Sequence, residues 1–312
     1  LTSVTMSDSF NGLNAAGGQF NGCTKLQRAV LSAALKELPA RTFFACGLTE
    51  LPDLKNVASI GQACFQRNNA MTAVTIPETV TYLAGNAFAY NTGLKEVTIL
   101  GTPEMGSGSF SKDTALEKFT APKLTYIGVS AFDGDTALTE FVVPDNLTFI
   151  GDKAFQNCKN LTKLIFPSTY KAPTLTLGTQ LFLKCTKFTG IVVEDGANIR
   201  LDDAGVLYTA DGKTLIAATD SFKATSYTVA DGVETISPSA FYSKTGLTTI
   251  TLPASMKSIG DKAFYGCTGL TAITFPDGMS SLGVSAFDGC TKLATVGFGK
   301  SLTAVPAYAF NK

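Results

Sequence analysis

Seven cysteines are the side chains of this 312-residue chain best suited to chemistry, and six of them recur at one spacing. Each of the six stands three residues after a phenylalanine: Cys23, Cys46, Cys158, Cys185, Cys267 and Cys290. Thiols in such an array could serve as nucleophiles, metal ligands or disulfide partners. The chain has no His, which excludes Ser-His-Asp and Cys-His arrangements and leaves a cysteine nucleophile without its usual activating imidazole.

In other copies the same position holds Asn or Asp, as at Asn68 and Asp113, which indicates a small buried group that can form hydrogen bonds. Cys158 with Cys185 and Cys267 with Cys290 fall in successive copies. Rungs about 5 Å apart lie within the Cα range of a disulfide, but side chains stacked in parallel do not give the required dihedral angle of about 90°. We therefore expect buried free thiols, with disulfides as the alternative and a metal site as the least favoured reading.

Two serine motifs resemble catalytic sequences without completing them. Ser130 and Ser285 stand in Gly-Val-Ser-Ala-Phe, which lacks the last glycine of a nucleophile elbow. Ser109 and Ser168 begin matches to S-x-x-K whose spacing arises readily by chance. All four serines fall within repeated sequence, so we expect them to be structural.

Acidic pairs and overall composition point the same way. Two acidic pairs lack the further ligands and the closing Glu of a calcium loop: Asp133 with Asp135, and Asp202 with Asp203. Of the two pairs, only Asp202 and Asp203 leave weak calcium binding open. The 25 basic and 25 acidic residues give a formal charge of zero, without the basic surface that nucleic-acid binding needs. No apolar run approaches the roughly 18 residues of a membrane span. We predict no catalytic residue, metal or cofactor, no nucleic-acid partner and no membrane-spanning segment.

A column of phenylalanines organises the chain, because they recur every 22 or 23 residues. Its members include Phe20, Phe43, Phe65, Phe88, Phe110, Phe132 and Phe155, and then Phe241, Phe264, Phe287 and Phe310. After each comes a segment of the form L-x-x-I-x-L-P, as in Leu247–Pro253, and then an Ile-Gly pair that leads back to Ala-Phe. The copies of this segment start at Leu1, Leu26, Leu48, Met71, Leu94, Leu116, Leu138, Leu161, Phe188, Leu247, Leu270 and Leu293, with a further one over Ala224–Val229.

The unit predicts a solenoid. Side chains alternate along a strand, so the two large residues of I-x-L point inward, and Pro ends the strand because it cannot donate to the ladder. Gly permits a tight bend, and one unit cannot bury its apolar residues without stacked neighbours. We expect a single leucine-rich-repeat solenoid over 1–312, a horseshoe or right-handed superhelix. Its concave face would carry a parallel β-sheet, and its convex side short strands and helical turns.

The repeat L-T-x-I-x-L-P-x-x-V-x-x-I-G-x-x-A-F-x-x-C resembles the BspA-like leucine-rich repeats, also called Treponema-type repeats. The segment Gly260–Leu270 is a nearly ideal copy, and the resemblance covers essentially the whole chain. It implies a secreted or cell-surface protein of Bacteroides-like and other host-associated bacteria, with adhesion to host proteins or to other cells. The family has no catalytic motif to carry over. The long interruption, and the stretches near 101–109 and 167–180, depart from the pattern.

The interruption covers about 194–223, between repeats over roughly 1–193 and 224–312. Gly205–Tyr208 and Thr214–Ala217 are β-prone and flank Asp211-Gly212, which indicates a β-hairpin. We expect this hairpin to project from the edge of the solenoid. It either joins two sub-arrays or forms a side wall of a binding site.

A candidate ligand surface follows from the positions expected to face solvent. The central residue of I-x-L is mostly Thr, but Val142, Ile165 and Val192 form an apolar stripe. Tyr82, Tyr126 and Phe149 precede the Ile-Gly bend, and their rings should lean outward, where aromatic side chains favour interfaces. Alternating charges at Glu96, Lys118, Glu140 and Lys163 are expected to set strand register by cross-strand pairing.

These features favour a non-catalytic surface protein that binds a host extracellular protein or glycoprotein, or another cell-surface molecule. The alternative is carbohydrate capture at the bacterial surface, which the absence of Trp weakens. An enzyme using only carboxylates would need paired acids in one pocket, and the exposed strand positions alternate in charge instead.

Overall fold

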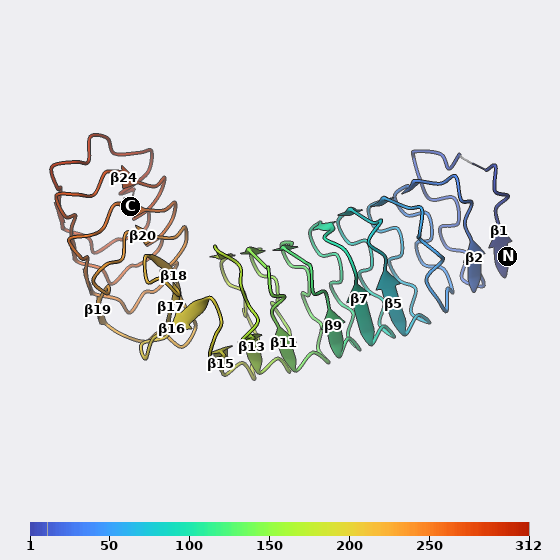
Figure 1. Cartoon of the computed structure of the whole chain (residues 1–312), viewed down its shortest axis with the longest axis horizontal. Helices are drawn as coiled ribbons and strands as arrows, with labels where there is room; N and C mark the ends of the chain where they lie inside the picture. Colours follow the sequence, from blue (N-terminus) through green and yellow to red (C-terminus); the bar gives the residue numbers. More distant parts are fainter. Residues whose placement is uncertain (11, 312) are drawn as a thin grey trace. The chain divides into compact units, whose positions relative to one another are not determined.

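The computed structural model describes residues 1–10 and 12–311, in two compact units. The first unit holds residues 1–166 and 180–189, and the second holds 167–179 and 190–312. Each unit is a parallel β-solenoid in which every repeat adds one rung of short strands (Figure 1). Among the described residues, no helix has the length and apolar character needed to cross a bilayer.

The L-x-x-I-x-L segments of the first unit form what we call the front sheet. Its strands are β1 (Ser3–Thr5), β2 (Arg28–Val30), β5 (Ala73–Ile76), β7 (Glu96–Ile99), β9 (Lys118–Thr120), β11 (Glu140–Val142) and β13 (Lys163–Phe166). Neighbours pair in parallel with the repeat in register, as Val74 with Val97 and Phe141 with Leu164. The predicted copy at Leu48 forms no strand, so the front sheet is interrupted between β2 and β5.

The residues before the glycine bend form a second ladder, the side sheet. In the first unit it comprises β3 (Glu37–Leu38), β4 (Ser59–Ile60), β6 (Tyr82–Leu83), β8 (Glu104–Met105), β10 (Tyr126–Ile127) and β12 (Phe149–Ile150). The glycine that follows allows close approach between rungs. A Cβ at Gly151 would lie 2.6 Å from the backbone nitrogen of Val129, so any larger residue would push the rungs apart.

The second unit repeats both ladders. Its front strands are β15 (Gly190–Val193), β19 (Ser226–Thr228), β21 (Thr249–Thr251), β23 (Ala272–Thr274) and β25 (Thr295–Gly297). Its side strands are β14 (Thr176–Leu177), β16 (Ile199–Leu201), β17 (Val206–Thr209), β18 (Thr214–Ala218), β20 (Thr235–Ile236), β22 (Ser258–Ile259) and β24 (Ser281–Leu282).

The phenylalanine column is confirmed as a spatial column in each unit. In the first unit Phe65 and Phe88 stack with ring centroids 5.2 Å apart, and Phe132 and Phe155 with centroids 5.4 Å apart. In the second unit Phe264 lies 5.0 Å from Phe241 and is fully buried. One ring per rung therefore fills the interior, and each ring is covered by the rungs before and after it.

The expected helical turns are absent from the described residues. The residues two before and two after each phenylalanine adopt positive φ, as at Ser130 (53°) and Lys153 (56°), and left-handed residues do not continue an α-helix. The phenylalanine N–H instead donates to the next rung, from Phe65 to the Ala87 carbonyl at 2.8 Å. We call the segment from two residues before to two residues after each phenylalanine the arc. The arcs therefore form a third ladder of hydrogen bonds between rungs, in place of the hydrogen bonds inside a helix.

The inserted hairpin is confirmed, but it does not project from the solenoid. β17 pairs antiparallel with β18 and with β16, and β18 pairs in parallel with β20, so the hairpin continues the side sheet of the second unit. Val206 and Leu215 are fully buried and join the same core as Phe241. Its apolar side chains find more burial inside the unit than an exposed ribbon would offer.

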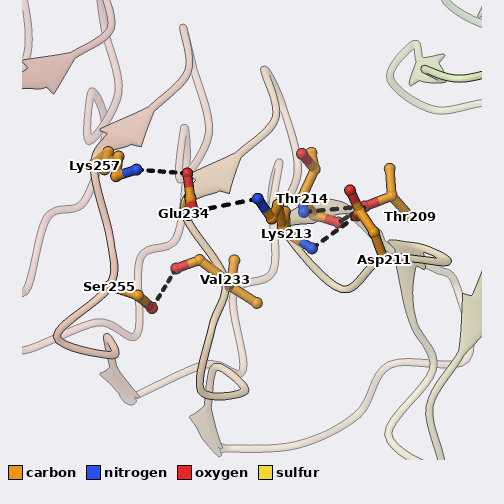
Figure 2. A network of polar contacts seen from close by, with 8 residues as sticks. All are labelled: Thr209, Asp211, Lys213, Thr214, Val233, Glu234, Ser255 and Lys257. Atoms are coloured by element: carbon orange, nitrogen blue, oxygen red, sulfur yellow. Dashed lines mark hydrogen bonds and ion pairs between the residues drawn. The ribbon is translucent and has the colours of Figure 1, made fainter.

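The hairpin turn is tied to the rungs that follow it, as Figure 2 shows. The Asp211 carboxylate accepts hydrogen bonds from the Thr209 hydroxyl (2.6 Å) and the Lys213 N–H (3.0 Å). Glu234 then bridges two rungs, with its oxygens 3.8 Å from the Lys213 ammonium and 2.7 Å from the Lys257 ammonium. These cations lower the pKa of Glu234, the hydrogen bond from Lys257 being the main cause. Because the groups are exposed, the network fixes register more than it adds stability.

The phenylalanine column gives the first prediction. Replacing the buried ring of Phe264 with Ala should lower the free energy of unfolding by about 3 to 5 kcal/mol, because two neighbouring rings lose a packing partner. Urea denaturation followed by circular dichroism measures the change. The matched control is Val284→Ala, at a side chain that is 44% exposed and should change stability little. Equal effects of the two substitutions would contradict the role assigned to the column.

Candidate functional site

The apolar stripe predicted on the front sheet begins on β11 and β13. Val142 lies opposite Ile165 in the parallel register, and their neighbours Phe141 and Leu164 point into the core. The Val142 side chain is 55% exposed, and Ile165 is half-buried beside it. The alternation of a strand therefore places two branched apolar side chains together on the outer face of the first unit.

The third member of the predicted stripe, Val192, lies on β15 of the second unit and is 38% exposed. The central positions of the neighbouring front strands in the first unit carry threonine instead, as at Thr98 on β7 and Thr120 on β9. Val142 and Ile165 thus stand out as an apolar pair beside a polar sheet.

Charged residues on the outer face pair across strands, as predicted. Lys118 on β9 lies opposite Glu96 on β7, and the ammonium is 2.5 Å from the carboxylate. Glu140 lies opposite Lys163, two positions before Val142 and Ile165 on the same strands. The Glu96 and Lys118 side chains are 44% and 66% exposed, so the pair favours the correct register at a gain of a few tenths of a kcal/mol.

The predicted aromatic column divides into a pair and a single ring. Tyr126 on β10 and Phe149 on β12 stack with centroids 4.6 Å apart and are half-buried. Tyr82 on β6 is 42% exposed and lies opposite Glu104, which separates it from that pair in the side sheet. Phe149 and Val142 belong to different sheets of their rung, so the structure brings together two smaller patches rather than one surface.

The cysteine column is a hydrogen-bond ladder within the arcs. Each thiol in a set of five donates to the carbonyl of the phenylalanine one rung earlier, at 2.9 to 3.1 Å. The set is Cys46, Cys158, Cys185, Cys267 and Cys290. The predicted need for a small buried hydrogen-bonding group at this position is therefore confirmed, and the geometry explains it: a phenylalanine carbonyl inside the solenoid must find a donor.

Burial also makes these thiols poor nucleophiles. It raises the pKa of Cys267 to about 12 and that of Cys290 to about 11. The seventh cysteine, Cys64, precedes Phe65 and is fully buried, which raises its pKa to about 12. Since the thiolate is the reactive form, these buried cysteines are poorly suited to nucleophilic attack.

Four central rungs carry the same column with Asn or Asp, as at Asn68, Asn91, Asp113 and Asp135. The backbone N–H of each of the first three donates to the side-chain oxygen of the next, from Asn91 to Asp113 at 2.7 Å and from Asp113 to Asp135 at 2.9 Å. Asn68 also donates its amide to the Phe43 carbonyl at 2.8 Å, as a cysteine would. The amides and carboxyls thus extend the ladder without thiols.

The two carboxyls in this column are the most unusual groups in the first unit. Asp113 and Asp135 are fully buried, and one oxygen of each has no hydrogen-bond partner among the described residues. Burial is the main cause that raises the pKa of both well above the usual range, and the charge of Asp135 adds to the rise at Asp113. A protonated carboxyl regains a donor and matches the cysteines and asparagines of the other rungs. Sequence reasoning grouped these residues with the polar ladder but missed their titration.

The serines that resemble catalytic motifs serve the repeat framework. The positive φ of Ser130 and Ser285 is shared by the corresponding residue of other repeats, such as Lys153, and so is no sign of a strained nucleophile. Ser109 is buried and donates its hydroxyl to the Gly106 carbonyl at 2.6 Å. The ammonium of Lys171 contacts the carbonyl of Ser168 rather than its hydroxyl.

The second unit contains a buried chain of hydrogen bonds through two tyrosine hydroxyls, here called the phenol relay, that was not predicted from the sequence. Tyr208 and Tyr227 share a short hydroxyl–hydroxyl hydrogen bond, and Tyr227 donates to the Asp202 carboxylate at 2.6 Å. The second Asp202 oxygen accepts the Val206 N–H at 2.8 Å. Both oxygens of Asp202, which had been weighed as a calcium ligand, are therefore engaged in holding the hairpin. The described residues contain no cluster of three acidic or cysteine side chains placed to bind a metal.

The repeat defines the family. The model of the BspA-type leucine-rich repeat region matches residues 1–112, 103–202 and 219–312. The chain therefore belongs to the BspA-type leucine-rich repeat family, as its motif indicated. A search of curated protein sequences finds no match.

Solved structures share the fold. A leucine-rich repeat protein from Eubacterium ventriosum is 21% identical with a TM-score of 0.53, over 98% of this chain and 68% of that one. The pneumococcal vaccine antigen PcpA is 26% identical with a TM-score of 0.51, over 76% of this chain and 64% of that one. The chain thus spans about two thirds of the length of each. The likeness supports the solenoid and leaves the ligand open to proposal.

The buried carboxyls predict a pH dependence. A folded-state pKa above the unfolded value of about 3.9 means that Asp113 holds its proton more tightly in the native protein, so its contribution to stability is fully present below about pH 4 and is lost as pH rises. Asp113→Asn keeps the oxygen that accepts from Asn91 and supplies a permanent donor. It should raise the free energy of unfolding at pH 7 by about 1 to 3 kcal/mol and flatten the decline between pH 4 and 8.

Urea denaturation across that pH range measures the effect of Asp113→Asn. Asp231→Asn, at an exposed carboxyl in the second unit, is the control and should leave the profile unchanged. Parallel pH profiles for the wild type and Asp113→Asn would show that Asp113 does not titrate as inferred.

The phenol relay predicts a localised loss of stability. Tyr227→Phe removes the donor to Asp202 and the partner of the Tyr208 hydroxyl, and should cost about 1 to 3 kcal/mol. Hydrogen exchange should show faster opening of β16, β17 and β18 than of the first unit. Tyr265→Phe, in a half-buried ring stacked on Tyr242, is the control. Uniform exchange changes in both units would refute a local role.

Proposed function

We propose that the chain is a non-catalytic binding module of a secreted or cell-surface bacterial protein. It recognises a protein or glycoprotein partner through the front sheet around β11 and β13. The observation that carries the proposal is the 55% exposure of Val142 beside Ile165, at a position that the front strands β7 and β9 fill with threonine. A paired apolar patch rimmed by charged residues such as Glu140 and Lys163 has the composition of a protein-binding surface.

Physical arguments support a binding role over catalysis. The thiols of Cys64, Cys267 and Cys290 are buried and their pKa values raised, and the serines donate to backbone carbonyls or stand in the repeat framework. The outer faces form a rigid, repetitive surface with few distinctive side chains. Such surfaces suit recognition by area and shape, as in other solenoid proteins. Membership of the family supports the proposed cell-surface location.

The proposal is tested by probing arrays of extracellular-matrix proteins and glycans with the purified chain. Any ligand found should lose affinity, by about tenfold or more, for a variant that carries Val142→Thr, Ile165→Thr and Val192→Thr, because the apolar contact area is lost. The variant should keep the melting temperature and circular dichroism of the parent, since threonine occupies the same positions on neighbouring strands.

The matched control carries Val129→Thr and Val284→Thr, two exposed valines outside the strands, and should bind as the wild type does. Unchanged binding by the triple variant would rule out the front-sheet surface. A glycan ligand that is lost on Tyr82→Ala but retained by the triple variant would favour carbohydrate capture at the side sheet instead.

A further inference from the structure

The front sheet is interrupted at the rung of Leu48, as it is again between β9 and β11, and at the Leu48 rung the sequence shows why. Aligned on Ile60 and Leu83, the segment that starts at Leu48 has the same length as the one that starts at Met71. In that alignment Pro52 takes the place of Thr75 and Asp53 the place of Ile76, but Pro52 is buried and Asp53 is exposed, which reverses the pattern of β5. Pro52 has no N–H for the ladder, and the Asp53 side chain turns to solvent.

The break leaves two strand edges open. β2 pairs only with β1, and β5 pairs only with β7 and lies at the edge of its sheet. The Thr49 N–H donates to the Gln27 carbonyl at 3.2 Å, and the next backbone hydrogen bond that this rung donates to the previous one is from Ala58 to Lys36. Among the described residues, the backbone between Thr49 and Ala58 makes no hydrogen bond to β2. An open strand edge is a template for another strand.

A hollow of about 510 Å³ lies beside this edge, within the first unit. Its apolar lining includes Leu31 and Leu51, both half-buried. Leu31 occupies the inward position of its rung, where Ile76, Ile99 and Val143 are 0 to 1% exposed. Asp53 is exposed and does not fill the matching inward position, and Leu31 is left half-buried although Pro52 and Leu54 of this rung are buried.

The rim of the hollow is charged and has one carboxylate in excess. Arg28 lies 3.5 Å from Glu50, and Lys55 lies 3.3 Å from Asp53. Asp8 also lines the hollow, and no cation pairs with it among the described residues. A partner with a basic side chain would complete this set of charges.

We propose that the rung of Pro52 is a docking site for an extended peptide segment of a partner protein, which adds a strand at the open edge of β2. One apolar side chain of the peptide packs on Leu31 and Leu51, in the place that an inward residue holds in other rungs. A neighbouring Lys or Arg faces Asp8. Backbone hydrogen bonds give affinity in this mode, and alternate side chains give specificity.

This site is separate from the surface proposed above, because it involves neither Val142 nor Ile165. A peptide fits it better than a compact ligand does. The groups left without partners belong to a strand edge, which another extended backbone can pair with, and apolar and charged side chains both line the hollow beside it. The two proposals can therefore fail independently.

The test selects peptides from a phage-displayed library of random nonapeptides on the immobilised chain. A repaired variant with Pro52→Thr, Asp53→Leu and Leu54→Pro serves for counter-selection. Its segment matches Leu247–Pro253 in pattern and closes the sheet with the chain's own residues. Selected peptides should alternate apolar and polar residues and carry Lys or Arg. They should bind the repaired variant about tenfold or more weakly, and its melting temperature should rise.

Two further measurements distinguish strand addition from general stickiness. Synthetic copies of the selected peptides with alternate amides N-methylated should lose binding, because they cannot pair with β2. Asp8→Asn should weaken peptides that contain Lys or Arg and spare their neutral analogues. Equal binding to the wild type and the repaired variant, indifference to N-methylation, or no wild-type-specific peptide would each overturn the proposal. Binding of Val142→Thr should stay unchanged in every case.

Discussion

The stacking of one phenylalanine ring per rung is the interaction on which the rest of this structure depends. A single repeat cannot cover its own ring, so each ring is buried only because two neighbours lie about 5 Å away on either side. That spacing is also the spacing of backbone ladders, and the front sheet, the side sheet and the arcs all adopt it. The glycine before each arc serves the same constraint by allowing rungs to approach to contact distance.

Polar chemistry inside the solenoid follows from that stacking. The tight arcs turn phenylalanine carbonyls inward, where only a short side chain can reach them. Cysteine and asparagine both meet this requirement, as Cys267 and Asn68 illustrate, whereas Asp113 in the same column keeps one oxygen without a partner among the described residues. The residues that first suggested reactivity thus owe their positions to a buried acceptor. Their raised pKa values result from the same burial that stabilises the rungs.

Most of the fold could be predicted from the sequence because the period of the repeat is also its period in space. Phe88 and Phe264 could be placed from spacing alone. The helical turns could not be excluded, because residues such as Ser130 and Lys153 show no preference for positive φ; inter-rung hydrogen bonds impose it. The docking of the hairpin onto β20 was missed for a similar reason. The turn signal at Asp211-Gly212 is local, whereas the burial of Leu215 depends on the tertiary context.

The candidate site was less predictable, because the sequence gives side-chain direction but not the distance between patches. Alternation identified Val142 and Ile165 correctly as outer residues of adjacent strands, yet it could not reveal that Tyr82 stands apart from the Tyr126–Phe149 pair. The effect of Pro52 was not predicted, because the segment that starts at Leu48 keeps the spacing of the repeat. Spacing alone does not reveal a defective rung, since the neighbouring rungs supply the core and the repeat tolerates it.

The rungs that depart from the pattern are where this solenoid can acquire specificity. A perfect repeat presents the same threonine-rich face at each step and offers a partner nothing to distinguish one rung from the next. Each departure costs some packing or hydrogen bonding, as the half-buried Leu31 shows beside the outward-turned Asp53. The neighbouring rungs tolerate that cost because their own cores are complete. Rigid repeats thus permit local defects, and a local defect with open hydrogen-bonding groups is a surface that another chain can complete.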